Sequence, residues 1–309
     1  MWVLAGGLLL GWGLGSNDSA NIFGTAVASN VIKYRTAIIL TSLFVVTGAV
    51  LEGHKAMDTV GEMSRMTATG AFLATISAGL CVSLFSYLAI PVSASQAIMG
   101  AVLGIGILTG IPDLTRLYRV LICWLFTPVG GVFFTAALYP LVGRLFQKAL
   151  LDIRWQSGVI YLALLASGCY GAYALGANNV ANVTGVYVGS GMLGPVEASL
   201  IGSMAIASGV ITYSKKVMYT VGRKIVELDN FSAFISTLSA AITTHLFTQV
   251  GVPVSTSQAI VGAVAGIGII KGSQTLRKKV ILEIVAGWVS TPLFSGLMAY
   301  LLMRIVIAF

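Results

Sequence analysis

The chain has 309 residues, of which 57% are hydrophobic and only 9% are charged, whereas charged residues make up about 25% of an average soluble domain. So few charges cannot cover the surface of a soluble protein of this length, which excludes an ordinary soluble enzyme, a nucleic-acid-binding domain and a disordered chain. The composition is that of a polytopic membrane protein, and the net charge of +8 fits the basic loops that such proteins keep in the cytoplasm.

The first segments of the chain alternate between apolar and polar. Residues 1–32 are apolar except for the sequence GSNDSAN at 15–21. Residues 36–51 carry no charge and form a candidate membrane span, whereas the polar residues 53–65 are expected to lie at the membrane interface.

A candidate hairpin comes next. The apolar stretches 67–90 and 97–111 flank an uncharged tip, PVSASQ at 91–96. The stretch 117–145, which contains Pro128, is predicted to cross the membrane once more.

The second half of the chain repeats this order of segments. Its predicted elements are spans over 161–190, 196–213 and 280–309, a polar segment 214–229, and a hairpin formed by 231–252, the tip PVSTSQ at 253–258 and 259–271. Residues 91–107 and 253–269 are identical at 14 of 17 positions, and residues 15–29 and 176–190 at seven of 15. The chain is therefore predicted to consist of two homologous repeats, 1–150 and 151–309, joined by a basic segment around 144–154.

The segments around each tip allow two topologies, either two full spans or a re-entrant hairpin whose tip stops near the middle of the membrane. We favour the hairpin because the two tips are polar, uncharged and nearly identical, which is unusual for surface loops. Each repeat then contributes three further spans, an odd number, so the second repeat inserts upside down relative to the first. The expected fold is an all-α membrane protein with two inverted-topology repeats, the arrangement of many secondary transporters.

The basic residues predict which side of the membrane faces the cytoplasm. With this topology, 13 of the 18 Lys and Arg residues lie on one side, in the loops around 33–35, 144–154, 214–229 and 271–279. The positive-inside rule makes that side cytoplasmic. Both termini of this multi-pass cell-membrane protein are then expected on the extracytoplasmic side.

Asp18 is a carboxylate well inside an apolar segment, where it is costly unless it faces a cavity, a cation or a proton path. Oxygen-bearing side chains surround it, and a second such group lies at the matching place in the other repeat. The candidate cation-binding residues are Asn17, Asp18, Asn21, Asn178, Asn179 and Asn182, with Asp18, Asn17 and Asn178 as the expected sodium ligands. Such oxygen ligands suit a hard cation such as Na⁺, or a protonatable site, although asparagines also join helices by hydrogen bonds.

The two tips are the second candidate site. Pro91 and Pro253 precede hydroxyl residues and then an apolar run, so each tip is expected to begin a helix, whose free N–H groups attract an anion. N-capping explains one hydroxyl in each tip but not the repeated Ser-x-Ser-Gln pattern. The expected anion-binding residues are Ser93, Ser95, Gln96, Ser255, Thr256, Ser257 and Gln258.

These motifs resemble those of the inorganic phosphate transporter (PiT) family. GSNDSAN and GANNVAN are similar to its duplicated G-A-N-D-x-A-N signature, and PVSASQ and PVSTSQ to its P-V-S-T-T-x element. The resemblance covers both repeats and implies cation-coupled phosphate symport, with the cation near the Asn/Asp motifs and phosphate near the tips. Two departures matter: Asn179 replaces the second Asp of the signature, and Ala94 replaces a Thr in the first tip.

The predicted function is therefore that of a transporter and not an enzyme. It imports inorganic phosphate with Na⁺ or H⁺ as the coupling ion and needs no other cofactor. A permease for sulfate or another oxyanion with the same fold and a passive anion channel are the alternatives, and a homodimer is an assembly that the sequence leaves open. His245 is expected to be a buried histidine with satisfied hydrogen bonds, and Glu283 to help the scaffold pack.

Overall fold

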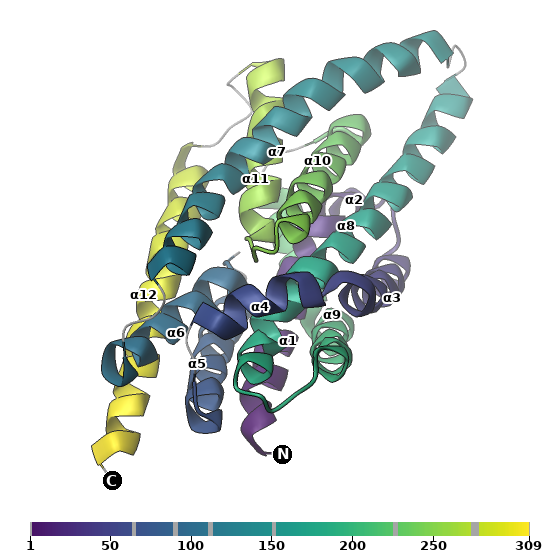
Figure 1. Ribbon diagram of the computed structural model, residues 1–309. Helices are drawn as coiled ribbons and strands as arrows, with labels where there is room; N and C mark the ends of the chain where they lie inside the picture. Colours follow the sequence, from purple (N-terminus) through teal and green to yellow (C-terminus); the bar gives the residue numbers. More distant parts are fainter. Residues whose placement is uncertain are drawn as a thin grey trace.

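The protein is described by a computed structural model that covers residues 2–63, 66–88, 92–110, 114–149, 153–224, 228–272 and 278–308. All regular elements in these ranges are helical, and Figure 1 shows their arrangement. In chain order they are η1 (Trp2–Leu4), α1 (Ala5–Asp18), α2 (Ala20–Ala28), α3 (Tyr34–Glu52), α4 (His54–Met63), α5 (Ala68–Tyr87), α6 (Ala94–Thr109), α7 (Leu114–Ala149), α8 (Ile153–Gly189), α9 (Pro195–Lys224), α10 (Asn230–Gln249), α11 (Thr256–Lys271) and α12 (Lys278–Ala308).

Within the described ranges, seven helices are long and apolar enough to cross a membrane, so this is a multi-pass membrane protein. They include residues Tyr34–Glu52, Ala68–Tyr87, Thr115–Lys148, Trp155–Gly189, Pro195–Tyr219, Asn230–Gln249 and Val285–Ala308. The second arms of the two hairpins, α6 and α11, have 16 residues each and are about 24 Å long at 1.5 Å per residue. The hydrocarbon core is about 30 Å thick, so these lengths suit re-entrant arms, which remain a prediction.

The two repeats differ in where their helices break. The first motif interrupts the helix at Ser19, between α1 and α2, whereas α8 runs unbroken through the second motif. The first repeat has a separate helix α4 that lies across the bundle (Figure 1), but the equivalent polar residues of the second repeat mostly continue α9 to Lys224. The expected basic linker also differs, because residues 144–149 end α7 and residues 153–154 begin α8.

The two repeats interlock instead of forming separate bodies. The second arm of each hairpin packs on the last long helix of the other repeat, α6 on α12 and α11 on α7. Close approach depends on Gly100, which lies against the backbone of Pro292, and on Gly262, which lies against Pro128; a methyl group on either glycine would overlap the proline carbonyl oxygen. The boundary near residue 150 separates two repeats of the sequence. It does not separate two structural domains, because helices from either side of it pack against each other.

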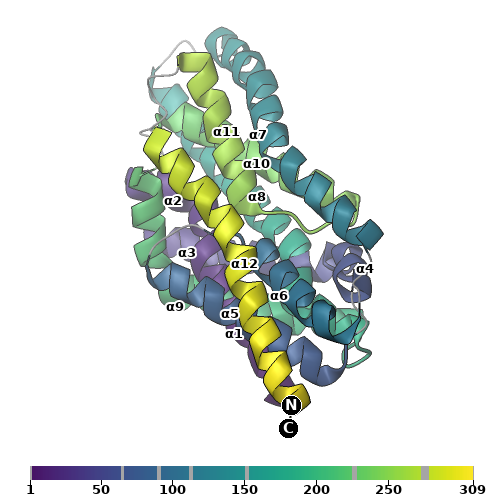
Figure 2. The same ribbon diagram turned by 90° about the vertical axis from the view of Figure 1, so that its left-hand side faces the viewer.

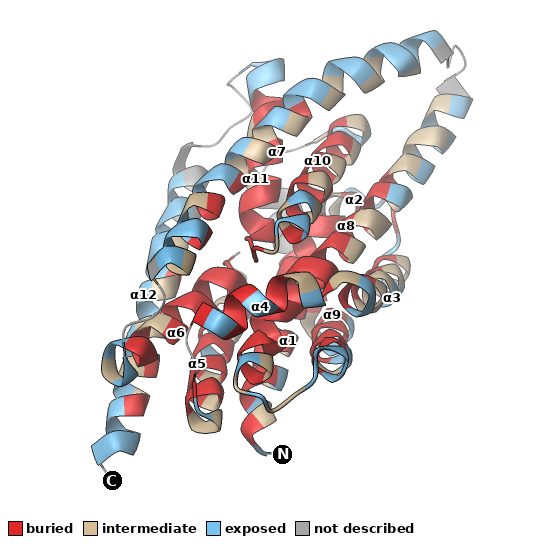
Figure 3. Ribbon diagram, in the orientation of Figure 1, coloured by how far each residue is buried: buried red, intermediate tan, exposed pale blue. Residues whose placement is uncertain are grey.

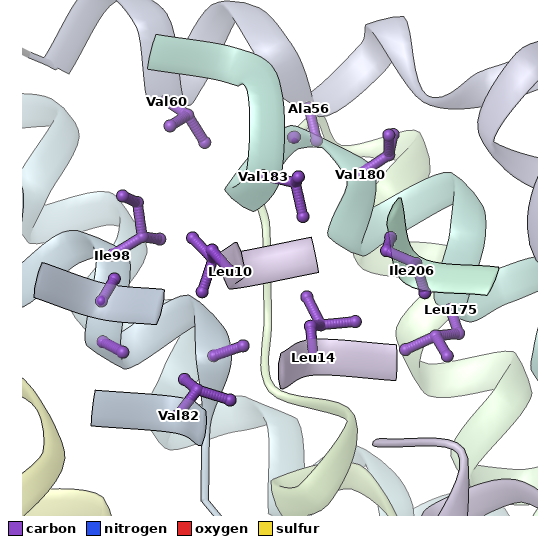
Figure 4. Packing of buried hydrophobic residues seen from close by; sticks show 14 of the residues in the cluster. Leu10, Leu14, Ala56, Val60, Val82, Ile98, Leu175, Val180, Val183 and Ile206 are labelled. Atoms are coloured by element: carbon purple, nitrogen blue, oxygen red, sulfur yellow. The ribbon is translucent and has the colours of Figure 1, made fainter. Parts of the chain in front are cut away.

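The core lies where helices from both repeats meet. Figure 4 shows Leu10 and Leu14 of α1 near Val183 of α8 and Ile206 of α9. In Figure 3 the buried residues fill this centre, while exposed residues, many of them large and apolar, lie along α7 and α12, as expected for helices that face lipid.

Equivalent helices of the two repeats run in opposite directions. In Figure 1, α1 and α7 rise through the view, whereas α8 and α12 descend. Both termini lie at one end of the molecule (Figures 1 and 2), and the end of α7 and the beginning of α8 lie at the other. Inverted repeats require this arrangement, although the orientation in a membrane remains a prediction.

Candidate functional site

Each hairpin tip begins a helix, and its first serine is the N-cap. The backbone N–H of Gln96 donates to Ser93 Oγ at 3.2 Å, and the N–H of Gln258 donates to Ser255 Oγ at 3.2 Å. The capping hydroxyls lie 3.0 Å from Ser95 Oγ and 2.8 Å from Ser257 Oγ, respectively. Pro91 lies outside the described residues.

The tips retain donors for an anion. Each pair of serines has two hydroxyl hydrogens and uses one in its mutual hydrogen bond, so the other remains to donate. The first turns of α6 and α11 also present backbone N–H groups that have no partner within the helix, together with the positive end of the helix dipole. The arrangement is suited to an oxyanion and uses no basic side chain.

Asn17 and Asn178 hold the two tips against the motif helices. Asn178 Oδ1 accepts from the N–H of Val254 at 2.8 Å, and its Nδ2 donates to Thr248 Oγ1 and to the carbonyl of Val252. Asn17 Oδ1 accepts from the N–H of Val92 at 3.3 Å, and its Nδ2 donates to Ser86 Oγ. These two expected sodium ligands, Asn17 and Asn178, therefore each position the tip of their own repeat.

Asp18 connects the first motif to the tip of the other repeat. Thr256 Oγ1 donates to Asp18 Oδ2 at 2.8 Å. Since the preceding residue, Asn17, holds the first tip, the two tips meet at this motif. The structure thus brings Asn17 and Asp18 of the first motif into contact with both tips, although sequence reasoning had placed Thr256 with the anion alone.

Several polar atoms at this site are buried and have no hydrogen-bond partner among the described residues. They are Asp18 Oδ1, Ser19 Oγ, Asn21 Oδ1 and Nδ2, Gln96 Oε1, Asn179 Nδ2, Asn182 Oδ1 and Gln258 Oε1. None of the predicted site residues is more than 7% exposed, so the site is closed to solvent in this conformation. Buried polar atoms without partners are rare and costly, which makes them candidate contacts for bound ions.

A second polar cluster, which the sequence did not reveal, lies beside the second tip. We call it the Glu52 network, and its members are Glu52, Lys55, Tyr173, His245 and Gln249. The Glu52 carboxylate accepts from Tyr173 Oη at 2.7 Å and from Lys55 Nζ at 2.9 Å, and it contacts His245 Nε2 at 3.2 Å. The members come from α3, α4, α8 and α10, so no local sequence pattern could have grouped them.

His245 is satisfied as expected, but it is only partly buried. Its Nδ1 contacts Tyr170 Oη at 2.8 Å, and its Nε2 contacts Gln249 as well as Glu52. The side chain of Glu283 lies outside the described residues. No group of three or more His, Cys, Asp and Glu side chains that could hold a metal ion is found in the described ranges.

Comparisons with known proteins agree with this architecture. Residues 14–299 match the family described as the phosphate transporter family. A protein of Methanocaldococcus jannaschii named "putative phosphate permease" is 30% identical over 296 residues, which cover 95% of this chain and 93% of that protein. A sulfate permease of Bacillus subtilis is 28% identical over 306 residues, which cover 96% of this chain and 85% of that protein. A solved structure described as the sodium-dependent phosphate transporter has the same fold, with a TM-score of 0.89, 22% identity and 100% of both chains covered.

Proposed function

The chain belongs to the phosphate transporter family, and from this premise we propose that it imports inorganic phosphate by symport with Na⁺ or H⁺. The observation that carries the proposal is that two helix N-termini, whose tips have no charged side chains, meet the motif of the buried carboxylate Asp18 at a site closed to solvent. A helix N-terminus attracts an anion and a carboxylate attracts a cation, so the site can bind both together.

The proposed cation position is at Asp18. Its Oδ1 has no partner, and Asn21 Oδ1 is a second buried oxygen without one. Thr256 Oγ1 donates its hydrogen to Asp18, which leaves its lone pairs to face a cation. In a site of low dielectric constant, the charge of the cation offsets that of the anion, so each ion favours the binding of the other.

The proposed anion position lies between the tips. Its proposed ligands are Ser95 and Ser257, which contact the capping serines of their tips, together with the backbone N–H groups of the first helical turns. Gln96 Oε1 and Gln258 Oε1 are buried acceptors without partners, and either could accept the proton of a P–OH group. Transport then requires the hairpins or the surrounding helices to open this closed site alternately to the two sides of the membrane.

Uptake of radiolabelled phosphate into proteoliposomes tests this proposal directly. Sodium and pH gradients are imposed separately, and we expect one of them to drive accumulation. Asp18→Asn should abolish accumulation or uncouple it from the gradient, because the variant lacks the negative charge. Flux that ignores both gradients would indicate a passive channel and overturn the symport proposal.

Sulfate is the second candidate substrate. We consider it because a relative from Bacillus subtilis is named as a sulfate permease. Sulfate is tetrahedral like phosphate but carries no proton at neutral pH, so it gains nothing from the unpartnered Gln96 and Gln258 carbonyl oxygens. We therefore expect excess sulfate to leave phosphate uptake unchanged. Competition by sulfate, followed by measured sulfate uptake, would change the substrate and leave the site in place.

A further inference from the structure

The internal repeat gives the cation position an equivalent in the second repeat. Asp18 corresponds to Asn179 at an offset of 161, and Thr256 corresponds to Ala94 at an offset of 162. Alanine has no hydroxyl group and asparagine has no charge. The hydrogen bond between Thr256 and Asp18 therefore has no chemical counterpart at the equivalent position.

The unpartnered atoms at the two positions also differ in kind. At Asp18 the atom without a partner is the carboxylate oxygen Oδ1, which attracts a cation. At Asn179 the carbonyl oxygen Oδ1 accepts from Asn182 Nδ2 at 2.9 Å, so the atom of Asn179 without a partner is the amide nitrogen Nδ2, and the neutral carbonyl oxygen of Asn182 is the other unpartnered atom of the pair. An amide N–H can only donate, so it suits an anion and opposes a cation.

The assignment of Asn179 as the donor follows the amide orientation in which its Nδ2 has no partner. If the amides of both Asn179 and Asn182 are reversed, the bond between them persists with donor and acceptor exchanged. The unpartnered N–H group then belongs to Asn182 and the unpartnered carbonyl oxygen to Asn179, and in either orientation the pair is neutral and presents one donor. Asp18 instead has a charge and is followed by Asn21, whose Oδ1 and Nδ2 are both unpartnered.

We propose that this transporter binds a single coupling cation, at Asp18, and that the equivalent position in the second repeat has become part of the anion site, where the amide of Asn179 donates to the oxyanion. The inference rests on the proposed symport function and specifies how many cations accompany each anion. It also reassigns Asn179, which the sequence had grouped with the cation residues.

The test measures how far phosphate accumulates at equilibrium in proteoliposomes held at zero membrane potential, with a tenfold gradient of the cation that drives uptake. One coupled cation limits the accumulation of the transported phosphate species to about tenfold, and two would allow about a hundredfold, because each tenfold ratio is worth about 1.4 kcal/mol. We expect about tenfold for the natural protein. Accumulation well above tenfold would overturn the single-cation proposal, whereas an absence of gradient-driven uptake would contradict the symport function itself.

Variants at the equivalent position separate the two roles. Asn179→Ala should raise the KM for phosphate and leave the accumulation limit at about tenfold, because it removes an anion donor and no cation ligand. A lowered limit would make Asn179 a cation ligand and overturn the proposal. Ala94→Thr combined with Asn179→Asp rebuilds the chemistry of Asp18 and Thr256 and should raise the limit, while Ala94→Thr alone is the matched control.

A binding measurement gives a readout that does not depend on transport. Calorimetric titration of the purified protein with the driving cation should show one bound cation per chain, and Asp18→Asn should show none. Two cations bound to the natural protein, or a full equivalent retained by Asp18→Asn, would contradict the assignment.

Discussion

At the scale of single residues, the contact between Thr256 and Asp18 shows how the two repeats share one site. The hydroxyl belongs to the tip of the second repeat and the carboxylate to the motif of the first, so neither repeat contains the pair by itself. A hydrogen bond to a charged group typically contributes about 1.5–3 kcal/mol. Its loss would leave Asp18 buried with neither oxygen partnered in the ion-free state.

Thr256→Val tests this contact, because valine keeps the shape of threonine and removes the hydroxyl. We expect the cation concentration for half-maximal uptake to rise about tenfold, which corresponds to about 1.4 kcal/mol. Thr256→Ser, which retains the hydroxyl, should behave more like the natural protein. Equal loss in both variants would show that the methyl group matters and not the hydrogen bond.

Asp229 is a second informative residue, at the base of the second hairpin and outside the membrane-spanning segments. Its carboxylate caps α10 by accepting from the N–H of Ser232 at 3.0 Å and forms an ion pair with Lys271 at the end of α11. Burial by itself would raise the pKa of Asp229, but the bonds from Lys271 and Ser232 outweigh it and lower the pKa below its ordinary value. The stabilisation is therefore present above the pKa of the unfolded chain and is lost as the pH falls through the lower, folded pKa.

Replacing Asp229 by alanine should lower the thermal unfolding temperature in detergent, since the loss of an N-cap costs about 1 kcal/mol. Asp229→Asn keeps a capping oxygen and loses the ion pair, so its effect should be smaller. The difference between Asp229→Asn and the natural protein should shrink as the pH is lowered below about 4. A difference that is constant with pH would show that the ion pair contributes nothing.

At the scale of helices, the glycine–proline contacts decide how closely the repeats interlock. Gly262 of α11 lies against the backbone of Pro128 in α7, and the equivalent pair joins α6 to α12. Gly262→Ala should destabilise the protein and reduce uptake, because the added methyl group would overlap the backbone carbonyl oxygen of Pro128. A backbone atom, unlike a flexible side chain, cannot rotate out of the way. Thermal unfolding in detergent measures the first effect. Gly158→Ala is the control: nothing lies within 4 Å of that site, and alanine favours a helix by about 1 kcal/mol over glycine.

The Glu52 network joins α3 and α4 of the first repeat to the end of α10, just before the second tip. Glu52→Gln removes the charge that Lys55 and Gln249 contact, so we expect faster hydrogen exchange at the backbone amides of residues 249–252. Asp58→Asn on the exposed face of α4 is the matched control and should not change this exchange. Unchanged exchange in Glu52→Gln would show that the turn is held without the network.

At the scale of the whole molecule, both termini lie at one end, and the end of α7 and the beginning of α8 lie at the other (Figures 1 and 2). The positive-inside rule predicts that the termini lie outside the cell. Trp2→Cys should therefore react with a membrane-impermeant maleimide on intact cells, whereas Lys148→Cys should react only after permeabilisation. The reverse pattern would invert the predicted topology. Native background should be low, since Cys81 and Cys123 are buried and Cys169 is partly buried.

The sequence by itself determined the class of protein and the two repeats, and it predicted the residues of the candidate site. Uniformly apolar segments identify membrane helices because lipid excludes charge, and a buried acid such as Asp18 is conspicuous for the same reason. The serine caps Ser93 and Ser255 were also predictable, because capping is a local interaction that repeats with the motif.

Only the tertiary structure decided which of these residues meet. Asp18 and Thr256 are 238 positions apart, and the Glu52 network gathers residues from four helices. The sequence also left open that Asn17 and Asn178 hold the tips and that the hairpin arms pack on the opposite repeat. The physical reason is that helix periodicity and capping act over a few residues, whereas these pairings follow from how glycine and proline surfaces let distant helices approach.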